Sequence, residues 1–276
     1  MRAKELIANA TGKLEAAGSS DAEREVIFLL SSIMDCDTCG CYLAENISDE
    51  FARKFFSSLE RRINGEPLQL IIGEWEFFGR PISIREGVFI PRPETEGLVQ
   101  LILDRTALEE ELYGLEIGIG SGAICANLLA ERPDLRMVGT DISPKAIELT
   151  AENARKLGVS DRLKLIHTNV ANGISGSFGF VVSNPPYVLT SELENLPIEV
   201  KADPKTALDG GEDGLDIIRE IIDCEPLIKP GGLIALEIHE DSGSRILELL
   251  SETFIDAEII RDLYGAERYA IAFKGK

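Results

Sequence analysis

Residues 115–122 read LEIGIGSG, and this stretch decides the fold class. The apolar residues before Gly118 are typical of a buried strand, and the run AICANLL after Gly122 is typical of a helix. Three glycines between them allow a tight turn and let a ligand approach the backbone closely. The succession predicts the first unit of an α/β sheet, although such a turn can also be purely structural.

From about residue 112 onward, strands and helices alternate along the chain. Candidate strands are LYGLEIG, RMVGTD, LKLIH, FGFVVSN and LIALEIH, and helices fall between several of them. Alternation of this kind predicts a parallel sheet with helices on both faces. The tail DAEIIRDLYGAERYAIAF predicts two further strands around Tyr264 and Gly265, as an antiparallel pair at the sheet edge.

The first part of the chain has a different character. Helical spacing of its apolar residues predicts three short helices. The next stretch, QLIIGEWEFFGRPISIREGVFI, predicts one or two β-hairpins, and a helix is expected from Pro93 to about Glu111. We therefore expect a helical domain at residues 1–66, a β-hairpin linker at 67–92 and an α/β domain at 93–276.

Composition and charge restrict the classes of function. Hydrophobic residues make up 44% of the chain, and no stretch approaches the roughly 18 apolar residues that span a membrane. The start does not resemble a signal peptide, so we expect a cytoplasmic protein without a membrane partner. A formal net charge of −20 repels phosphate backbones, so we expect no stable binding to nucleic acid.

Three of the five cysteines cluster in the segment DCDTCGCY, as Cys36, Cys39 and Cys41. No second pair of Cys or His residues follows at the spacing of a structural zinc site. We expect a reduced loop between two helices and no bound metal.

Acidic residues accompany the glycine turn. Glu116 stands at the carboxyl end of the strand, and the next strand ends about twenty residues further on at Asp141, where an acid can accept both hydroxyls of a ribose. A dinucleotide fits the glycine spacing, with its phosphates at the helix N-terminus. S-adenosyl-L-methionine also fits, because its cationic amino group and sulfonium favour an acid such as Glu116. The third strand runs into Asn169 and Val170, which are expected beside the adenine.

The fourth candidate strand runs directly into Asn184, Pro185, Pro186 and Tyr187, the most specific motif in the chain. A side-chain amide there points into the crevice at the carboxyl ends of parallel strands. The prolines fix the backbone and leave carbonyl acceptors, and Tyr187 offers a flat stacking surface. The Asn184 oxygen and the Pro185 carbonyl can accept both hydrogens of a planar NH₂ group and aim its lone pair at a methyl donor. Asn-Pro is also a common turn dipeptide.

The tetrapeptide NPPY together with LEIGIGSG resembles the seven-stranded S-adenosylmethionine methyltransferases that act on planar amino groups. The stretches GEPLQLIIGEWEFFG, VFIPRPETE, SNPPY, DPKTALDGGEDGL and RDLYGAER are similar to the bacterial release-factor glutamine methyltransferases, and the resemblance covers essentially the whole chain. It implies a Rossmann-like α/β methyltransferase domain after a small all-helical domain that helps to recognise the substrate. It also implies S-adenosyl-L-methionine as cofactor and peptide chain release factors as partners, methylated at the glutamine of their Gly-Gly-Gln loop.

The resemblance also implies roles for single residues. The segment with Phe89, Arg92, Glu94 and Thr95 matches the one that closes over cofactor and substrate, and Arg92 and Glu94 serve there either as contacts or as a structural ion pair. We assign the catalytic step to Asn184, Pro185, Pro186 and Tyr187, which with Arg92 and Glu94 also form the substrate site. The residues expected around the cofactor are Glu116, Gly118, Ile119, Gly120, Ser121, Gly122, Asp141, Ile142, Asn169, Val170, Asn184, Phe89 and Thr95.

Three positions depart from the usual pattern of the family. Asn169 stands where an acid is usual, Val170 where an aromatic residue is frequent, and Asp203 where Glu is usual. The first two leave the contacts to the adenine open, and none touches the tetrapeptide.

Two other functions compete with glutamine methylation. An N-methyltransferase that acts on adenine or guanine in nucleic acid shares the tetrapeptide, but the net charge and the lack of a Lys/Arg cluster beside the site favour a protein substrate. A non-catalytic regulator that binds S-adenosylmethionine has no physical need for Asn184 and the two prolines.

Overall fold

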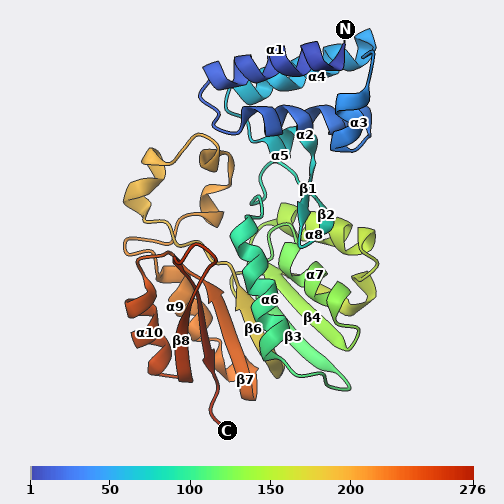
Figure 1. Cartoon of the computed structure of the whole chain (residues 1–276). Helices are drawn as coiled ribbons and strands as arrows, with labels where there is room; N and C mark the ends of the chain where they lie inside the picture. Colours follow the sequence, from blue (N-terminus) through green and yellow to red (C-terminus); the bar gives the residue numbers. More distant parts are fainter. Residues whose placement is uncertain (1) are drawn as a thin grey trace. The chain divides into compact units, whose positions relative to one another are not determined.

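The computed structural model describes residues 2–276, which form two compact units (Figure 1). The helical unit contains the chain up to residue 75 together with residues 197–202, and the sheet unit contains residues 76–196 and 203–276. Among the residues described, no helix has the length and apolar character needed to cross a membrane.

The helical unit contains five α-helices within the described part of the chain. They are α1 (Ala3–Ala16), α2 (Ala22–Met34), α3 (Thr38–Leu43), α4 (Asp49–Ile63) and α5 (Leu68–Ile72). Their apolar faces meet in one core, with Leu6, Leu30 and Phe55 fully buried. The helices are therefore held together by a shared hydrophobic core rather than by their individual propensities.

Residues 197–202 pack with the helical unit, although they lie within the range 93–276 that the sequence assigned to the α/β domain. The guanidinium of Arg62 pairs with Glu25 and with Glu199, each at 2.5 Å. Ile198 lies against Gly65, where a Cβ atom would come within 2.9 Å of it. This long-range ion pair and close approach leave no local pattern in the sequence.

Two segments of the helical unit differ from the prediction. The cysteine-rich segment forms α3 rather than a loop, because the Asp37 side chain accepts a hydrogen bond from the Gly40 backbone at 2.7 Å and Cys41 is buried in the core. Residues 68–72 form α5 rather than a strand, because Leu68 packs into the helical core and Gly73 ends the helix in a left-handed conformation. The hairpin begins only after that glycine.

The hairpin pairs β1 (Glu74–Phe77) with β2 (Arg80–Ser83). Arg80 donates to Asn127 at 3.2 Å and to Glu131 at 2.6 Å, both on α7 (Ala123–Glu131). The backbone of Ser83 exchanges two hydrogen bonds with the Asn153 side chain on α8 (Pro144–Lys156). These contacts fix β2 to the sheet unit.

The sheet unit is built on a seven-stranded sheet in the order β5-β4-β3-β6-β7-β9-β8. The five strands from β5 to β7 are parallel, and β9 and β8 continue the sheet antiparallel. The predicted parallel sheet and its antiparallel edge pair are therefore confirmed. The strands are β3 (Leu112–Ile117), β4 (Leu135–Asp141), β5 (Leu163–His167), β6 (Phe178–Ser183), β7 (Ile228–Glu237), β8 (Ile255–Arg261) and β9 (Glu267–Phe273).

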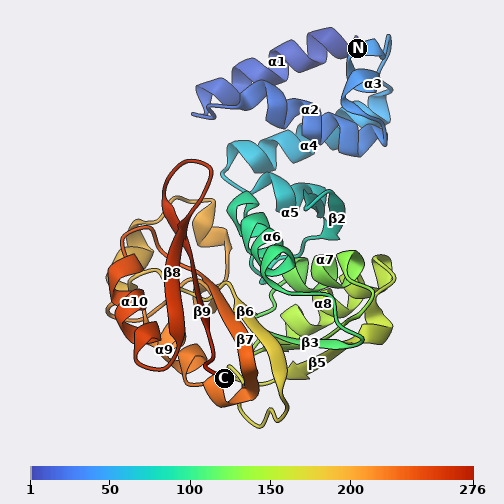
Figure 2. The same cartoon turned by 60° about the horizontal axis from the view of Figure 1, so that its bottom comes forward.

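Helices cover both faces of this sheet, as Figure 2 shows. The short 3-10 turn η1 (Pro93–Thr95) leads into α6 (Glu96–Arg105), which lies with α7 and α8 on one face. The helices α9 (Asp216–Ile222) and α10 (Gly243–Ser251) pack their isoleucines and leucines into the core on the other face. The helix α6 ends at Arg105 rather than near Glu111, because Thr106 is extended and its hydroxyl donates to the Ile102 carbonyl at 2.7 Å.

The order of the strands reverses between β5 and β6. The chain adds β4 and β5 outward on one side of β3, and then places β6 directly on the other side of β3. The carboxyl ends of β3 and β6 therefore lie next to each other at a topological switch point, where open α/β sheets bind their ligands.

Candidate active site

The glycine turn after β3 leaves its backbone accessible. Gly118 and Gly120 have φ of 73° and 54°, a region that favours glycine. A Cβ atom at either position would meet its nearest neighbours, Ser183 Oγ and Phe89 Cβ, only at 4.0 Å. The turn is fixed to β4, because the backbone N–H groups of Gly118 and Ile119 donate to the Thr140 carbonyl at 2.8 and 3.1 Å. The turn is thus fixed while its outer side has room for a ligand.

Asp141 lies beside this turn at the end of β4. Its two carboxylate oxygens accept hydrogen bonds from the backbone N–H groups of Gly120 at 2.9 Å and Ser143 at 2.8 Å. Burial raises the pKa of Asp141, and these two bonds oppose the rise. Each oxygen retains a second lone pair for a hydroxyl donor. The next side chain, Ile142, is 56% exposed and offers an apolar surface suited to a flat ring.

Glu116, which the sequence predicted beside the cofactor, is a buried acid. The residue is only 1% exposed, and among the residues described its Oε2 atom has no hydrogen-bond partner. Burial raises the pKa of Glu116 to about 8. A cationic group bound next to it would offset the cost of its desolvation. Glu116, Asp141 and the open glycine turn fit the amino group and ribose of S-adenosyl-L-methionine, whereas dinucleotide phosphates would meet two carboxylates.

Asn169 and Val170 follow β5, and the structure gives each a contact outside the expected cofactor set. The Asn169 amide donates to Glu220 on α9 at 3.4 Å. Val170 packs against the core beneath α9 and has φ of 47°, which is unusual for a β-branched residue and marks local backbone strain. Contacts of both residues with an adenine stay a prediction.

The predicted tetrapeptide lies at the end of β6, and its side chains join a hydrogen-bonded chain. The Asn184 Nδ2 donates to Thr95 Oγ1 at 3.1 Å, and that hydroxyl donates to Glu237 Oε2 at 2.7 Å. The Tyr187 hydroxyl donates to Glu237 Oε1 at 3.3 Å. The Asn184 nitrogen is therefore engaged within the protein, and its oxygen is the atom that can accept a hydrogen from a substrate.

Glu237 is a site residue that we did not anticipate. It ends β7 and is 1% exposed, and burial raises its pKa to about 7. The available signal was its position: an acid at the carboxyl end of the apolar strand LIALE, one strand away from the tetrapeptide.

The glycine-rich loop that follows the tetrapeptide packs against it. Backbone hydrogen bonds join Val188 to Leu208 at 2.9 Å and to Gly210 at 2.8 Å. A Cβ atom at Gly210 would lie 2.8 Å from the Tyr187 Cα, and one at Gly214 would lie 2.6 Å from the Tyr187 carbonyl. The glycines of the stretch DPKTALDGGEDGL therefore allow a contact that fixes the backbone of the tetrapeptide.

The segment before α6 is held by Asp203. The Asp203 side chain forms an ion pair with Arg92 and accepts a hydrogen bond from the Ile90 backbone at 2.9 Å. Arg92 therefore pairs with Asp203 and not with Glu94, so the idea of an Arg92–Glu94 ion pair is wrong. The Arg92 guanidinium also lies 5.2 Å from the Phe89 ring centroid, which is within the range of a cation–π contact.

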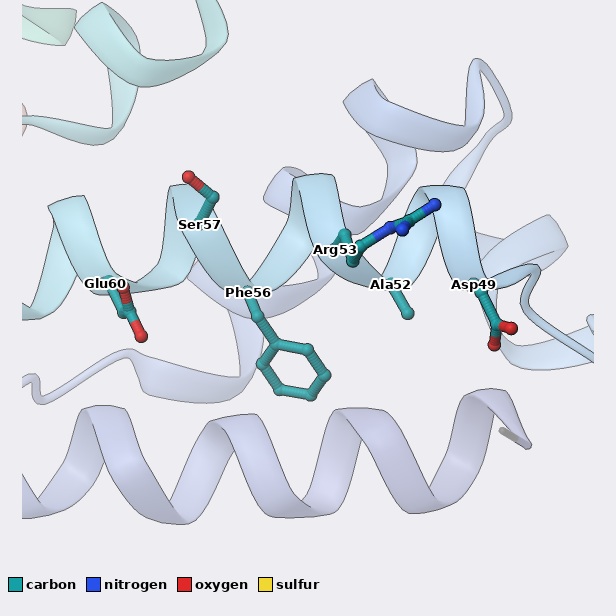
Figure 3. Close-up of a pocket in the computed structure, with 6 residues that line it drawn as sticks. All are labelled: Asp49, Ala52, Arg53, Phe56, Ser57 and Glu60. Carbon is teal, nitrogen blue, oxygen red and sulfur yellow. The ribbon is translucent and has the colours of Figure 1, made fainter.

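A separate groove of about 610 Å³ lies on the helical unit (Figure 3). In this view Phe56 points from α4 towards α1, where Lys13 Nζ lies 5.3 Å from the centroid of its ring. The lining of this groove contains none of the residues assigned to the active site and consists of Asp49, Ala52, Arg53, Phe56, Ser57 and Glu60. Within residues 2–276, no cluster of three or more His, Cys, Asp or Glu side chains is placed to hold a metal ion.

Comparisons with known proteins bear on both units. The model of the PrmC N-terminal domain matches residues 5–73, and that of the methyltransferase small domain matches residues 86–203. A release factor glutamine methyltransferase from Aquifex aeolicus is 38% identical, over 99% of this chain and 95% of the relative. One from Deinococcus radiodurans is 33% identical, over 99% and 98%. A methyltransferase structure from Pyrococcus furiosus has a TM-score of 0.54 at 18% identity, over 83% of this chain and 100% of its own, which supports the fold alone.

A chain with this sheet topology that matches the methyltransferase model is an S-adenosylmethionine-dependent methyltransferase. The relatives from Aquifex aeolicus and Deinococcus radiodurans each extend over 99% of it and are both described as release factor glutamine methyltransferases. The chain belongs to the release factor glutamine methyltransferase family.

Replacing Asp141 tests the ribose assignment. Asp141→Ala should weaken binding of S-adenosyl-L-methionine by about 1.5–3 kcal/mol, the scale of hydrogen bonds to a charged acceptor. Titration calorimetry would measure this change, with the exposed Asp161→Ala as a control that keeps its affinity. Unchanged affinity in Asp141→Ala would remove the assignment, and tight binding of NAD by the wild type would restore the dinucleotide alternative.

The pKa of Glu116 predicts how stability varies with pH. Because burial raises it from 4.5 to about 8, the folded protein without ligand binds more protons than the unfolded chain between these values. Its free energy of unfolding should therefore fall as pH rises from about 5 to about 8. Glu116→Gln should flatten this slope in urea titrations, whereas exposed Glu248→Gln should leave it unchanged. An equal slope in wild type and Glu116→Gln would contradict the raised pKa.

Proposed function

We propose that this protein methylates the side-chain amide nitrogen of a glutamine in peptide chain release factors. The observation that carries the proposal is the orientation of Asn184 at the end of β6. Its nitrogen is engaged by Thr95, so its oxygen is available to accept an N–H from a planar amide. The shared description of the curated relatives, release factor glutamine methyltransferase, supports the same substrate.

The cofactor is held at the carboxyl ends of β3 and β4. Glu116 receives the cationic amino group, Asp141 the ribose hydroxyls, and the turn of Gly118 to Gly122 approaches the cofactor through its backbone. Ile142 offers its exposed side chain to the adenine. S-adenosyl-L-methionine, when bound, supplies an electrophilic methyl group on a sulfonium.

The substrate amide is held by acceptors rather than activated by a base. An amide nitrogen is almost non-basic because its lone pair is delocalised. The Asn184 oxygen and the Pro185 carbonyl accept the two amide hydrogens and keep the nitrogen facing the methyl donor. The nitrogen loses one proton as or after it gains the methyl group. The Tyr187 ring packs against the substrate, and its hydroxyl is fixed by Glu237.

The helical unit takes the role of substrate recognition. We assign residues 1–66 to substrate recognition and residues 93–276 to methyl transfer, with residues 67–92 as the linker between them. The methyl transfer is directed at the Gly-Gly-Gln loop of the release factor. An acidic chain of net charge −20 suits a cytoplasmic protein that does not bind nucleic acid stably. The tetrapeptide alone does not separate this function from methylation of adenine or guanine, but the curated relatives favour the glutamine.

Asn184 provides the sharpest test of the chemistry. With a labelled methyl donor, the wild type should label a release factor and not tRNA, rRNA or DNA. Asn184→Ala removes one preorganised acceptor and should lower kcat by about 10²–10³, with little change in cofactor affinity. Wild-type turnover by Asn184→Ala on a release factor would exclude the positioning mechanism.

Two companion experiments use the same assay. Asn184→Asp keeps an acceptor but adds a negative charge. This charge stabilises the sulfonium of the bound cofactor more than the transition state, in which the sulfonium charge disperses. A lower rate with retained cofactor affinity is therefore expected. A release factor whose glutamine is replaced by glutamate has no amide N–H to hold and should not be labelled there.

A truncation tests the role of the helical unit. A chain that begins at Glu76 keeps β2 with its contacts to α7 and α8, and should bind S-adenosyl-L-methionine with an affinity close to that of the full chain. It should methylate a release factor poorly, which steady-state kinetics would show as a raised KM. Full activity of the truncated enzyme would mean that the helical unit has another role.

A further inference from the structure

Thr95 is the last residue of η1, and its backbone angles are helical, with φ of −64° and ψ of −20°. A capping residue at the start of a helix is extended, so α6 does not use the Thr95 hydroxyl as a cap. Here the side chain makes no capping bond. The buried hydroxyl instead lies between Asn184 and Glu237, at 3.1 and 2.7 Å. The Thr95 hydroxyl therefore joins the start of α6 to Asn184 after β6 and to Glu237 at the end of β7.

The chemistry of the three groups sets the direction of this hydrogen-bonded chain. Above its pKa of about 7 Glu237 is ionised and only accepts, so the Thr95 hydroxyl then uses its single hydrogen towards Glu237. Its oxygen is then free only to accept, and the partner from Asn184 must be the amide NH₂. If the Asn184 amide were flipped, its oxygen would face the Thr95 hydroxyl. That oxygen and the Glu237 carboxylate would then both need the single hydrogen of this hydroxyl. That orientation would leave a buried acceptor unpaired, which is unfavourable.

The remaining neighbours of Glu237 fit an ionised carboxylate at the end of β7. Its second oxygen accepts from the Tyr187 hydroxyl at 3.3 Å. The positive charge of Arg268 on β9 favours the ionised form, whereas burial and Glu94 oppose it. Two hydroxyl donors and one cation thus offset only part of the cost of burying a carboxylate that is 1% exposed, and its pKa is about 7.

We propose that Glu237 is a positioning residue that acts through Thr95 to keep the Asn184 oxygen directed at the substrate and its nitrogen directed away. The inference rests on the proposed function, because it explains how the acceptor of the substrate amide is selected. Without the carboxylate, both orientations of Asn184 are populated. In the reversed one an NH₂ group meets the substrate NH₂, and two donors face each other.

The test uses variants of the full-length enzyme in the release-factor assay. Thr95→Val keeps the volume and removes the hydroxyl, and Glu237→Gln keeps the shape and removes the charge. Each should lower kcat about ten- to hundredfold, with S-adenosyl-L-methionine affinity within about threefold of wild type. Thr95→Ser restores the hydroxyl and should recover most of the loss. In an Asn184→Ala background, which has no amide to orient, Thr95→Val should lower kcat no further.

A purely structural role predicts a different pattern: lower thermal stability, but unchanged kcat per folded molecule. Wild-type kcat in Thr95→Val or Glu237→Gln would overturn the inference, and so would a full additional loss in the Asn184→Ala background. If Glu237→Gln does not fold, the pair Thr95→Val and Thr95→Ser decides the question. Wild-type enzyme that labels no glutamine in the same assay would refute the proposed function and this inference with it. Active wild type with insensitive variants would refute only the inference.

Discussion

The reversal of strand order between β5 and β6 is the constraint on which the active site depends. Because β6 pairs with β3 on the side opposite β4, the glycine turn after β3 and the tetrapeptide after β6 begin from adjacent strand ends. Parallel strands deliver all their carboxyl ends to one edge of the sheet, so Asp141 and Glu237 arrive at the same edge from β4 and β7. Cofactor site and substrate site are thus consequences of one topological step.

Three buried carboxylates lie at this edge, and each is compensated in a different way. Asp203 is paired with Arg92 and accepts a backbone N–H, so it fixes the segment before α6. Glu237 accepts from two hydroxyls, which orders the tetrapeptide. Glu116 retains an oxygen without a partner in the described part of the chain, which suits a cationic ligand. The first two compensations are structural, and the third is the one we propose the cationic amino group of the cofactor to supply.

Local signals predicted much of the fold and part of the site. The strand LKLIH is β5 without any adjustment, the glycine turn and the tetrapeptide each follow a predicted strand, and Asp141 is the last residue of another. The errors arose where distant contacts decide the structure. Residues 68–72 are apolar enough for a strand, but packing against other helices makes them α5. The Arg92–Asp203 pair and the Thr95–Glu237 bond join residues 111 and 142 positions apart, which no local spacing can indicate.

The arrangement also explains why the site needs no strong base. Glu237 is the acid linked to the tetrapeptide, and in the proposed mechanism the Thr95 hydroxyl and the Asn184 side chain separate it from the substrate nitrogen. An amide nitrogen becomes acidic once it carries the methyl group and the positive charge, so its proton then leaves readily. What limits the reaction beforehand is orientation, because the lone pair is delocalised over the amide and must face the methyl carbon. Acceptors fixed in one orientation satisfy this need, and a buried carboxylate that only accepts hydrogen bonds is the group that can fix them.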